Sequence, residues 1–147
     1  MSEGPSPVGR DDLGFLLAKA AQRWNELLAE RFVAAGYGDV SPSYGSVLLP
    51  LFEEDGLRLG ELARRARLSK QTMTELVRRL ERDGLVERRP DATDGRAALV
   101  FLTARTRAFE PVAAGVLAEL DLLVRDRLDD ERVDELTSAL RELLDLG

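Results

Sequence analysis

The segment from Ser69 to Gly84 has the most regular hydrophobic pattern in this sequence. Its apolar residues recur at the i, i+3, i+4, i+7 spacing of one helix face, and they are Met73, Leu76, Val77 and Leu80. Ser69 is a residue type that caps a helix N-terminus, and Gly84 is the type that ends a helix in the left-handed conformation. The pattern predicts an amphipathic helix that buries one face and exposes a polar face.

A shorter helix and a β-hairpin are expected on either side of this segment. Leu59, Leu62 and Ala63 predict the shorter helix, which a three-residue turn (66–68) joins to Ser69. After Gly84 the runs "LVER" and "AALVFLT" are β-like, and "RPDATDG" between them is a turn sequence. A lone hairpin is marginally stable in water, so we expect it to pack on the helices. The side chains expected to pack there are Leu85, Val86, Leu99 and Phe101.

Most of the remaining sequence is also predicted to be helical. Helical spacing predicts helices from Asp11 to about Ala35, from Tyr44 to about Glu54 and from Thr103 to about Arg127. A final helix starts at Asp129 or Asp130. The expected fold is mainly α with a small β-hairpin, in a single domain of residues 11–147 behind a flexible tail of residues 1–10.

Charge is distributed unevenly along the chain. Residues 58–107 hold 13 Lys and Arg against 7 Asp and Glu, whereas the whole chain of 147 residues carries a formal charge of −6. A local basic excess in an acidic protein indicates one face that binds a polyanion, because screening limits charge effects to about 8–10 Å in physiological salt. We therefore expect nucleic acid binding at this part of the chain.

Several classes of function are disfavoured by residues that the sequence lacks. It contains no Cys and no His, which removes thiol chemistry, imidazole catalysis and Cys/His zinc sites. We expect no enzyme activity, no cofactor and no metal site. No apolar run reaches the roughly 18 residues that span a bilayer. The N-terminal "MSEGPSPVGR" does not have the apolar centre of a signal peptide, so a cytoplasmic location is expected.

The order helix, turn, Ser-capped helix and hairpin describes a winged helix-turn-helix. The exposed face of the capped helix fits the DNA major groove, where Gln and Arg make bidentate contacts with base edges. Hydroxyls at the helix N-terminus suit phosphate, and an Arg near the hairpin tip suits a minor groove or a phosphate. Asp94 is expected to brace Arg96 through a salt bridge. The residues expected to contact DNA are Ser69, Lys70, Gln71, Thr72, Thr74, Arg78, Asp94 and Arg96.

Residues 61–103 resemble the DNA-binding core of the MarR family of bacterial transcription regulators. The specific features are "LERDGLVER", a hairpin tip with Asp94 and Arg96, and an apolar strand that closes in Leu102-Thr103. The resemblance implies a homodimer with a winged helix-turn-helix of residues 43–103 and dimerisation helices in residues 11–40 and 104–147. It also implies binding to a pseudo-palindromic double-stranded operator and ligand-responsive regulation, usually repression.

The chain departs from the family pattern at three places. Arg67 stands in the turn where the family usually has Gly, and Arg58 stands where a helix often begins with Ser or Thr. The hairpin tip reads Asp94-Gly95-Arg96-Ala97, with one basic residue and one hydroxyl fewer than is usual, so some phosphate contacts are expected to be lost.

Two further expectations concern partners. Trp24, Tyr37 and Tyr44 are the aromatic residues that could line a pocket for a phenolic or other small organic effector, and ordinary packing is the alternative for them. The alternative function is a winged-helix module that binds protein without specific DNA binding. The cationic, polar face between Lys70 and Arg78 disfavours it, because protein interfaces favour aromatic and apolar residues.

Overall fold

The computed structural model describes residue 4 and residues 8–147, so most of the flexible tail expected for residues 1–10 lies outside the described residues. The fold is mainly helical with one small antiparallel sheet, as the sequence predicts. The elements in chain order are α1 (Leu13–Ala34), the 3-10 turn η1 (Pro42–Tyr44), α2 (Gly45–Glu53), β1 (Leu57–Arg58), α3 (Leu59–Ala66), α4 (Lys70–Arg82), β2 (Val86–Pro90), β3 (Ala98–Leu102), α5 (Ala104–Leu128) and α6 (Asp130–Leu144).

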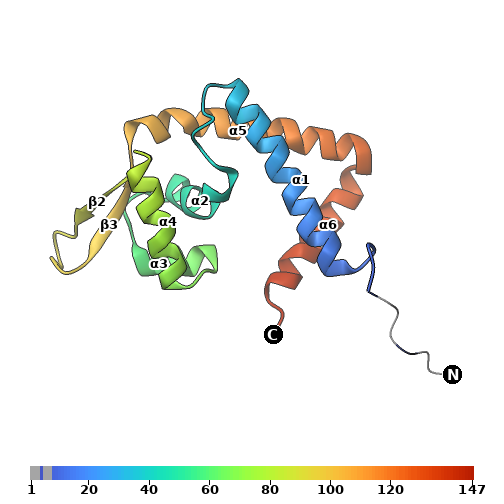
Figure 1. Cartoon of the computed structure of the whole chain (residues 1–147), viewed down its shortest axis with the longest axis horizontal. Helices are drawn as coiled ribbons and strands as arrows, with labels where there is room; N and C mark the ends of the chain where they lie inside the picture. Colours follow the sequence, from blue (N-terminus) through green and yellow to red (C-terminus); the bar gives the residue numbers. More distant parts are fainter. Residues whose placement is uncertain (1–3, 5–7) are drawn as a thin grey trace.

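The long helix α5 connects the two ends of the molecule. Figure 1 shows α2, α3, α4 and the hairpin near the first half of α5, and α1 and α6 beside the rest of it. One continuous cluster of buried side chains joins α1, α2, α3, α4, the sheet and α5. Its largest fully buried members include Phe109, Leu51, Leu62, Met73, Leu80, Leu85 and Leu120. Among the described residues, no helix is both long and apolar enough to cross a membrane.

The sheet has three strands in the order β1-β3-β2, whereas the sequence predicts only the hairpin β2-β3. The additional strand β1 is two residues long and pairs antiparallel with β3, with Leu57 opposite Val100. Asp55 holds it in place, because its carboxylate accepts hydrogen bonds from the backbone N–H of Gly56 (3.0 Å) and of Leu102 (2.9 Å). A two-residue strand has no periodicity of its own and forms only because β3 offers it an edge.

The register of the hairpin corrects the expected packing of β3. Val100 and Leu102 are the side chains of β3 that point into the core, and Leu102 lies opposite Val86. Leu99 and Phe101 lie on the other face and are half-buried. Side chains alternate along a strand, so an apolar run such as "AALVFL" is compatible with either face, and pairing with β2 decides the choice.

The turn between α3 and α4 is closed by Arg67 in the left-handed conformation (φ 57°, ψ 39°). This confirms the three-residue turn and shows that it keeps the backbone geometry for which Gly is the usual residue. The Arg67 side chain extends to the end of α6, where it donates to the carbonyl oxygen of Leu144 (3.2 Å) and pairs with Asp145 (3.0 Å). The helix-turn-helix is therefore attached to the last turn of α6.

Candidate nucleic-acid interface

Helix α4 presents the polar face that the sequence predicts. Met73, Val77 and Leu80 are fully buried against α2, α3 and the sheet, and the opposite side of the helix faces solvent. Ser69 caps the helix, since its hydroxyl oxygen accepts the backbone N–H of Thr72 (3.1 Å) and its O–H donates to the Thr72 hydroxyl (2.9 Å). Both hydroxyls remain exposed at the helix N-terminus, where a phosphate is best stabilised.

The exposed face carries more basic residues than the sequence analysis assigned to it. At helical spacing, Gln71, Arg78 and Arg82 lie on the side opposite the buried residues, and all three are exposed. Thr74 is half-buried, and its hydroxyl donates to the carbonyl oxygen of Lys70 (2.8 Å), so its methyl group is left for contact with a base. Arg79 and Arg82 are not among the residues expected to contact DNA, although the four-residue step from Arg78 to Arg82 is visible in the sequence.

Most basic residues of the segment 58–107 are already neutralised within the chain. Eight arginines make ion pairs, and these pairs are Arg58–Asp91, Arg64–Glu61, Arg65–Glu54, Arg67–Asp145, Arg88–Glu81, Arg89–Glu87, Arg105–Asp39 and Arg107–Asp55.

The remaining five basic residues of that segment make no ion pair with any residue that the structure describes. They are Lys70, Arg78, Arg79, Arg82 and Arg96, of which four lie on α4 and one lies at the tip of the hairpin. We call these five residues the free cation set. Their positive charge is available to an external polyanion, because no ion pair within the described chain has to be broken first.

The hairpin tip differs from its predicted arrangement. The predicted salt bridge between Asp94 and Arg96 is wrong, because the Asp94 carboxylate accepts the backbone N–H of Arg96 (3.1 Å) and makes no ion pair with its guanidinium. Short aspartate side chains commonly bind the backbone two residues on, which shapes a tight turn. Arg96 is exposed at this tip, so Asp94 positions its backbone and leaves its guanidinium free.

Asp91 fastens the base of the tip to β1. Its carboxylate accepts the backbone N–H (2.9 Å) and the hydroxyl (2.8 Å) of Thr93, and it binds the Arg58 guanidinium at 2.6 and 3.0 Å. The hydrogen bonds from Thr93, followed by the Arg58 contact, lower the pKa of Asp91 to about 2. This role could not be predicted from the sequence, because Arg58 and Asp91 meet only when β1 joins the sheet.

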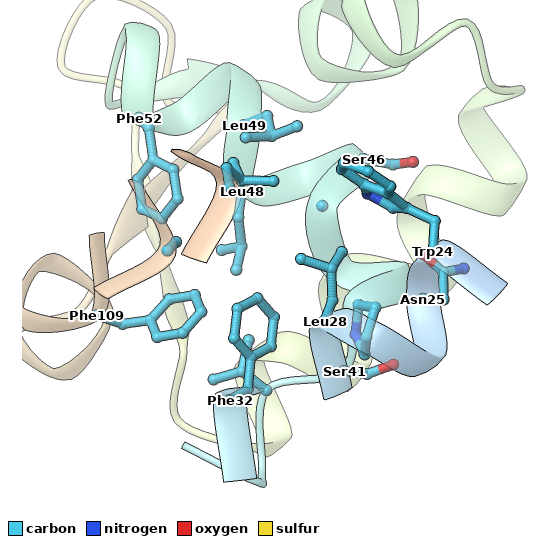
Figure 2. A pocket seen from close by; sticks show the side chains of 15 residues that line it. Trp24, Asn25, Leu28, Phe32, Ser41, Ser46, Leu48, Leu49, Phe52 and Phe109 are labelled. Carbon is cyan, nitrogen blue, oxygen red and sulfur yellow. The ribbon is translucent and has the colours of Figure 1, made fainter. Parts of the chain in front are cut away.

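A separate apolar cavity of about 270 Å³ lies between α1, α2 and α5. Figure 2 shows side chains around it from all three helices, including Trp24 and Phe32 of α1, Leu48 of α2 and Phe109 of α5. Ser41, Ser46 and Asn25 are its polar lining residues, and no lining residue from the described chain carries a charge.

The structure places only one of the three expected effector aromatics, Trp24, at this cavity. The Tyr37 ring packs outside it, 5.0 Å from the Phe109 ring and 4.9 Å from the Arg105 guanidinium. Tyr44 points away from it and donates its hydroxyl to the Asp83 carboxylate (2.6 Å). That hydrogen bond, together with burial, raises the pKa of Tyr44 above its ordinary 10.

Across residue 4 and residues 8–147, no three Asp or Glu side chains come together in a way that could hold a metal ion.

Comparison with known proteins links this interface to a protein family. The family model described as MarR family matches residues 40–98, which run from two residues before η1 to the first residue of β3. The transcriptional regulator TtmR of Methylorubrum extorquens is 37% identical over 112 residues, which are 71% of this chain and 56% of TtmR. A transcriptional repressor of Mycobacterium tuberculosis is 36% identical over 93 residues, which are 63% of this chain and 67% of the repressor. The chain thus spans little more than half of the first relative and two thirds of the second.

Solved structures support the same fold over almost the whole chain. The transcriptional regulator PcaV of Streptomyces coelicolor, in complex with its natural ligand, has a TM-score of 0.78 at 22% identity and covers 96% of this chain and 98% of its own. The transcriptional repressor CouR, bound to a 23-mer DNA duplex, has a TM-score of 0.77 at 24% identity, with 95% and 99% covered. The family model and the mycobacterial relative show that the chain belongs to the MarR family.

Proposed function

We propose that this chain is a sequence-specific DNA-binding transcription regulator that reads the major groove with α4 and a flanking minor groove with its hairpin. The observation that carries the proposal is the free cation set, which places unpaired positive charge on the exposed side of α4 and at the hairpin tip. The relatives described above are named transcriptional regulators and repressors, which supports the same function and favours repression.

Each residue of the interface has a role that follows from its chemistry. Gln71, Arg78 and Arg82 suit base edges, since Gln pairs with adenine and Arg with guanine through two hydrogen bonds. Thr74 offers its methyl group to thymine. The helix N-terminus, with Ser69, Lys70 and Thr72, suits a phosphate.

The hairpin completes the interface. A narrow minor groove concentrates negative potential and attracts the guanidinium of an exposed arginine such as Arg96, whose backbone Asp94 holds.

The protein is proposed to act as a homodimer through residues 11–40 and 104–147. Helices α1, α5 and α6 expose large apolar side chains that a second copy would cover; these include Leu13, Phe15, Leu16, Leu17, Leu122, Leu123, Leu136, Leu140 and Leu144. Two-fold symmetry would place two α4 helices in successive major grooves about 34–36 Å apart, on a pseudo-palindromic operator.

The apolar cavity is proposed as the site of a small organic effector. A carboxylate would be costly there, because a buried charge needs an opposite charge, and no charged residue of the described chain lines the cavity. An uncharged aromatic molecule with one hydroxyl would fill the apolar walls and bond to Ser41, Ser46 or Asn25. PcaV, whose fold is similar, has been solved with its natural ligand, which supports an effector in this fold.

The alternative of a protein-binding module is less well supported, because the exposed face of α4 is cationic rather than apolar. We further propose that the chain is not an enzyme, because its relatives are named as regulators, and that it works in the cytoplasm, where a bacterial regulator meets the chromosome.

A salt titration tests the proposed DNA contact without knowledge of the operator. Binding to a mixed-sequence duplex of about 30 base pairs is followed by fluorescence anisotropy at several salt concentrations. Each lost phosphate contact should lower the slope of log K against log salt by about 0.9. Arg79→Ala should show this loss, because Arg79 is proposed to contact a phosphate beside the groove. Arg96→Ala should also lower the slope, because a guanidinium in the minor groove displaces counterions. Arg88→Ala, whose side chain is paired with Glu81, serves as the matched control. Equal slopes for wild type and all variants would show that the free cation set does not contact DNA.

A further inference from the structure

The end of α4 is attached to two of the walls of the apolar cavity. Asp83 is the residue directly after α4, and its backbone N–H still bonds to the carbonyl oxygen of Arg79 (2.9 Å). Gly84 and Leu85 follow and lead into β2. Contacts to these three residues therefore determine how the C-terminal end of α4 is held.

The first attachment comes from the wall formed by residues 41–46. Ser41, Pro42, Gly45 and Ser46 line the cavity, whereas Tyr44, in the middle of the same turn, is buried and points to Asp83. The turn is tight, since the backbone N–H of Tyr44 donates to the carbonyl oxygen of Ser41 (2.9 Å) and a proline lies within it. A displacement of this wall would therefore carry the Tyr44 hydroxyl with it.

The second attachment comes from the first turn of α5 and from Thr103, the residue that precedes it. The Thr103 hydroxyl donates to the carbonyl oxygen of Gly84 (2.8 Å), and the buried Thr106 hydroxyl donates to that of Leu85 (2.6 Å). Farther along α5, Phe109 and Ala113 line the cavity. The two walls thus hold adjacent residues at the end of α4, and a molecule between them would change the distance between the two attachments.

We propose that Tyr44 is the positioning residue through which occupancy of the cavity reorients α4, by way of its hydrogen bond to Asp83. The proposal rests on the proposed effector site. It names the contact through which ligand binding at that site would change the orientation of α4. A ligand shifts α4 only if it binds better to one arrangement of the walls than to the other. The Tyr44–Asp83 bond transmits that difference, because it is a side-chain hydrogen bond that runs from the wall 41–46 to the residue directly after α4.

Tyr44→Phe tests the link, because it removes one hydroxyl and keeps the buried ring. Tyr37→Phe is the matched control, since it makes the same chemical change outside both the cavity and the link. The probe is 4-bromobenzyl alcohol, an uncharged aromatic alcohol whose bromine quenches tryptophan fluorescence. Trp24 is the single tryptophan of the chain and lines the cavity, so quenching that saturates with probe concentration and is weakened by Ala113→Leu reports binding there. Hydrogen exchange of the amides of residues 83–85 is measured with and without the probe.

We expect the probe to change exchange at residues 83–85 by about fivefold or more in wild type and in Tyr37→Phe. In Tyr44→Phe the change should fall below about twofold, with Trp24 quenched at the same probe concentration. An equal change in Tyr44→Phe would overturn the proposal, as would the absence of any change in wild type with Trp24 quenched.

Ala113→Leu provides a covalent occupant that does not depend on the affinity of the probe. It adds volume at the buried wall of α5, and folding is checked by circular dichroism. We expect it to change exchange at residues 83–85 in the otherwise wild-type chain and to have less than about half that effect when it is combined with Tyr44→Phe. Equal effects with and without Tyr44→Phe, or none in either case, would contradict the link. A probe that never quenches Trp24 would count against the effector site, and Ala113→Leu would still decide the role of Tyr44.

Discussion

Thr106, in the first turn of α5, donates its hydroxyl to the carbonyl oxygen of Leu85 with 2.6 Å between the two oxygens. Thr106 is completely buried, and it is the one polar residue in the buried set of the described chain. The bond joins the helix that spans the molecule to Leu85, the last of the three residues between α4 and β2. It therefore helps to hold α4 and the hairpin relative to α1 and α6.

Thr106→Val should destabilise the protein by about 1–2 kcal/mol. The substitution keeps the shape of the side chain and removes the donor, which leaves a buried carbonyl oxygen with weaker partners. Urea unfolding followed by circular dichroism measures the change. Thr137→Val is the control, because the Thr137 hydroxyl bonds only to the carbonyl oxygen of Val133 on its own exposed helix. A Thr106→Val loss no larger than that of Thr137→Val would show that the contact does not hold α5.

Arg67→Gly should change the free energy of unfolding by less than about 1 kcal/mol, whereas Arg67→Val should cost more than about 1 kcal/mol. Glycine adopts the left-handed conformation of this turn without strain, which offsets the loss of the exposed pair with Asp145. A β-branched side chain is a steric outlier at this φ. Urea unfolding of both variants is the measurement, and equal stabilities would contradict the backbone geometry of the turn.

The Asp91 carboxyl should titrate at about pH 2 in the folded protein. Hydrogen bonds from Thr93, followed by Arg58, lower its pKa from the ordinary 3.8. Because the folded-state pKa lies below the unfolded value, the stability that this carboxylate contributes is complete above about pH 4 and is lost as the pH falls toward about 2. Carboxyl carbon shifts in an NMR titration give the midpoint. A midpoint near 3.8 would mean that the Asp91 carboxylate has neither the Thr93 hydrogen bonds nor the Arg58 contact in solution.

The parts of the fold with strong local signals could be predicted from the sequence. Helix α4 has an uninterrupted apolar stripe, a serine that does cap it and a glycine at residue 84 with positive φ. The turn residues of the hairpin are equally local. These signals placed α4 and the hairpin tip correctly because each depends on residues within a few positions of one another.

The parts that depend on distant contacts could not be predicted. Strand β1 exists because β3 is beside it, and the register of β3 follows from its pairing with β2. The Asp94 carboxylate could bind either the backbone N–H or the guanidinium of Arg96. In the structure it accepts a hydrogen bond from the backbone N–H. Tyr44 points away from the cavity because Asp83, 39 residues later, lies within reach of its hydroxyl.

The ion pairing of arginines is also a property of the folded chain. The sequence shows 13 basic residues between Arg58 and Arg107, and only the fold separates the paired arginines from the free cation set. Arg79 and Arg82 enter the proposed interface for this reason.

Selection of bound duplexes from a random pool tests the central claim most directly. The full chain is incubated with random double-stranded DNA at about 0.15 M salt, and the bound fraction is sequenced over successive rounds. We predict enrichment of a pseudo-palindrome whose half-sites lie about one helical turn apart. Enrichment should fall when Gln71, Arg78 and Arg82 are replaced together by Ala, and it should persist in Arg88→Ala. Failure of the wild-type protein to enrich any motif would contradict the account.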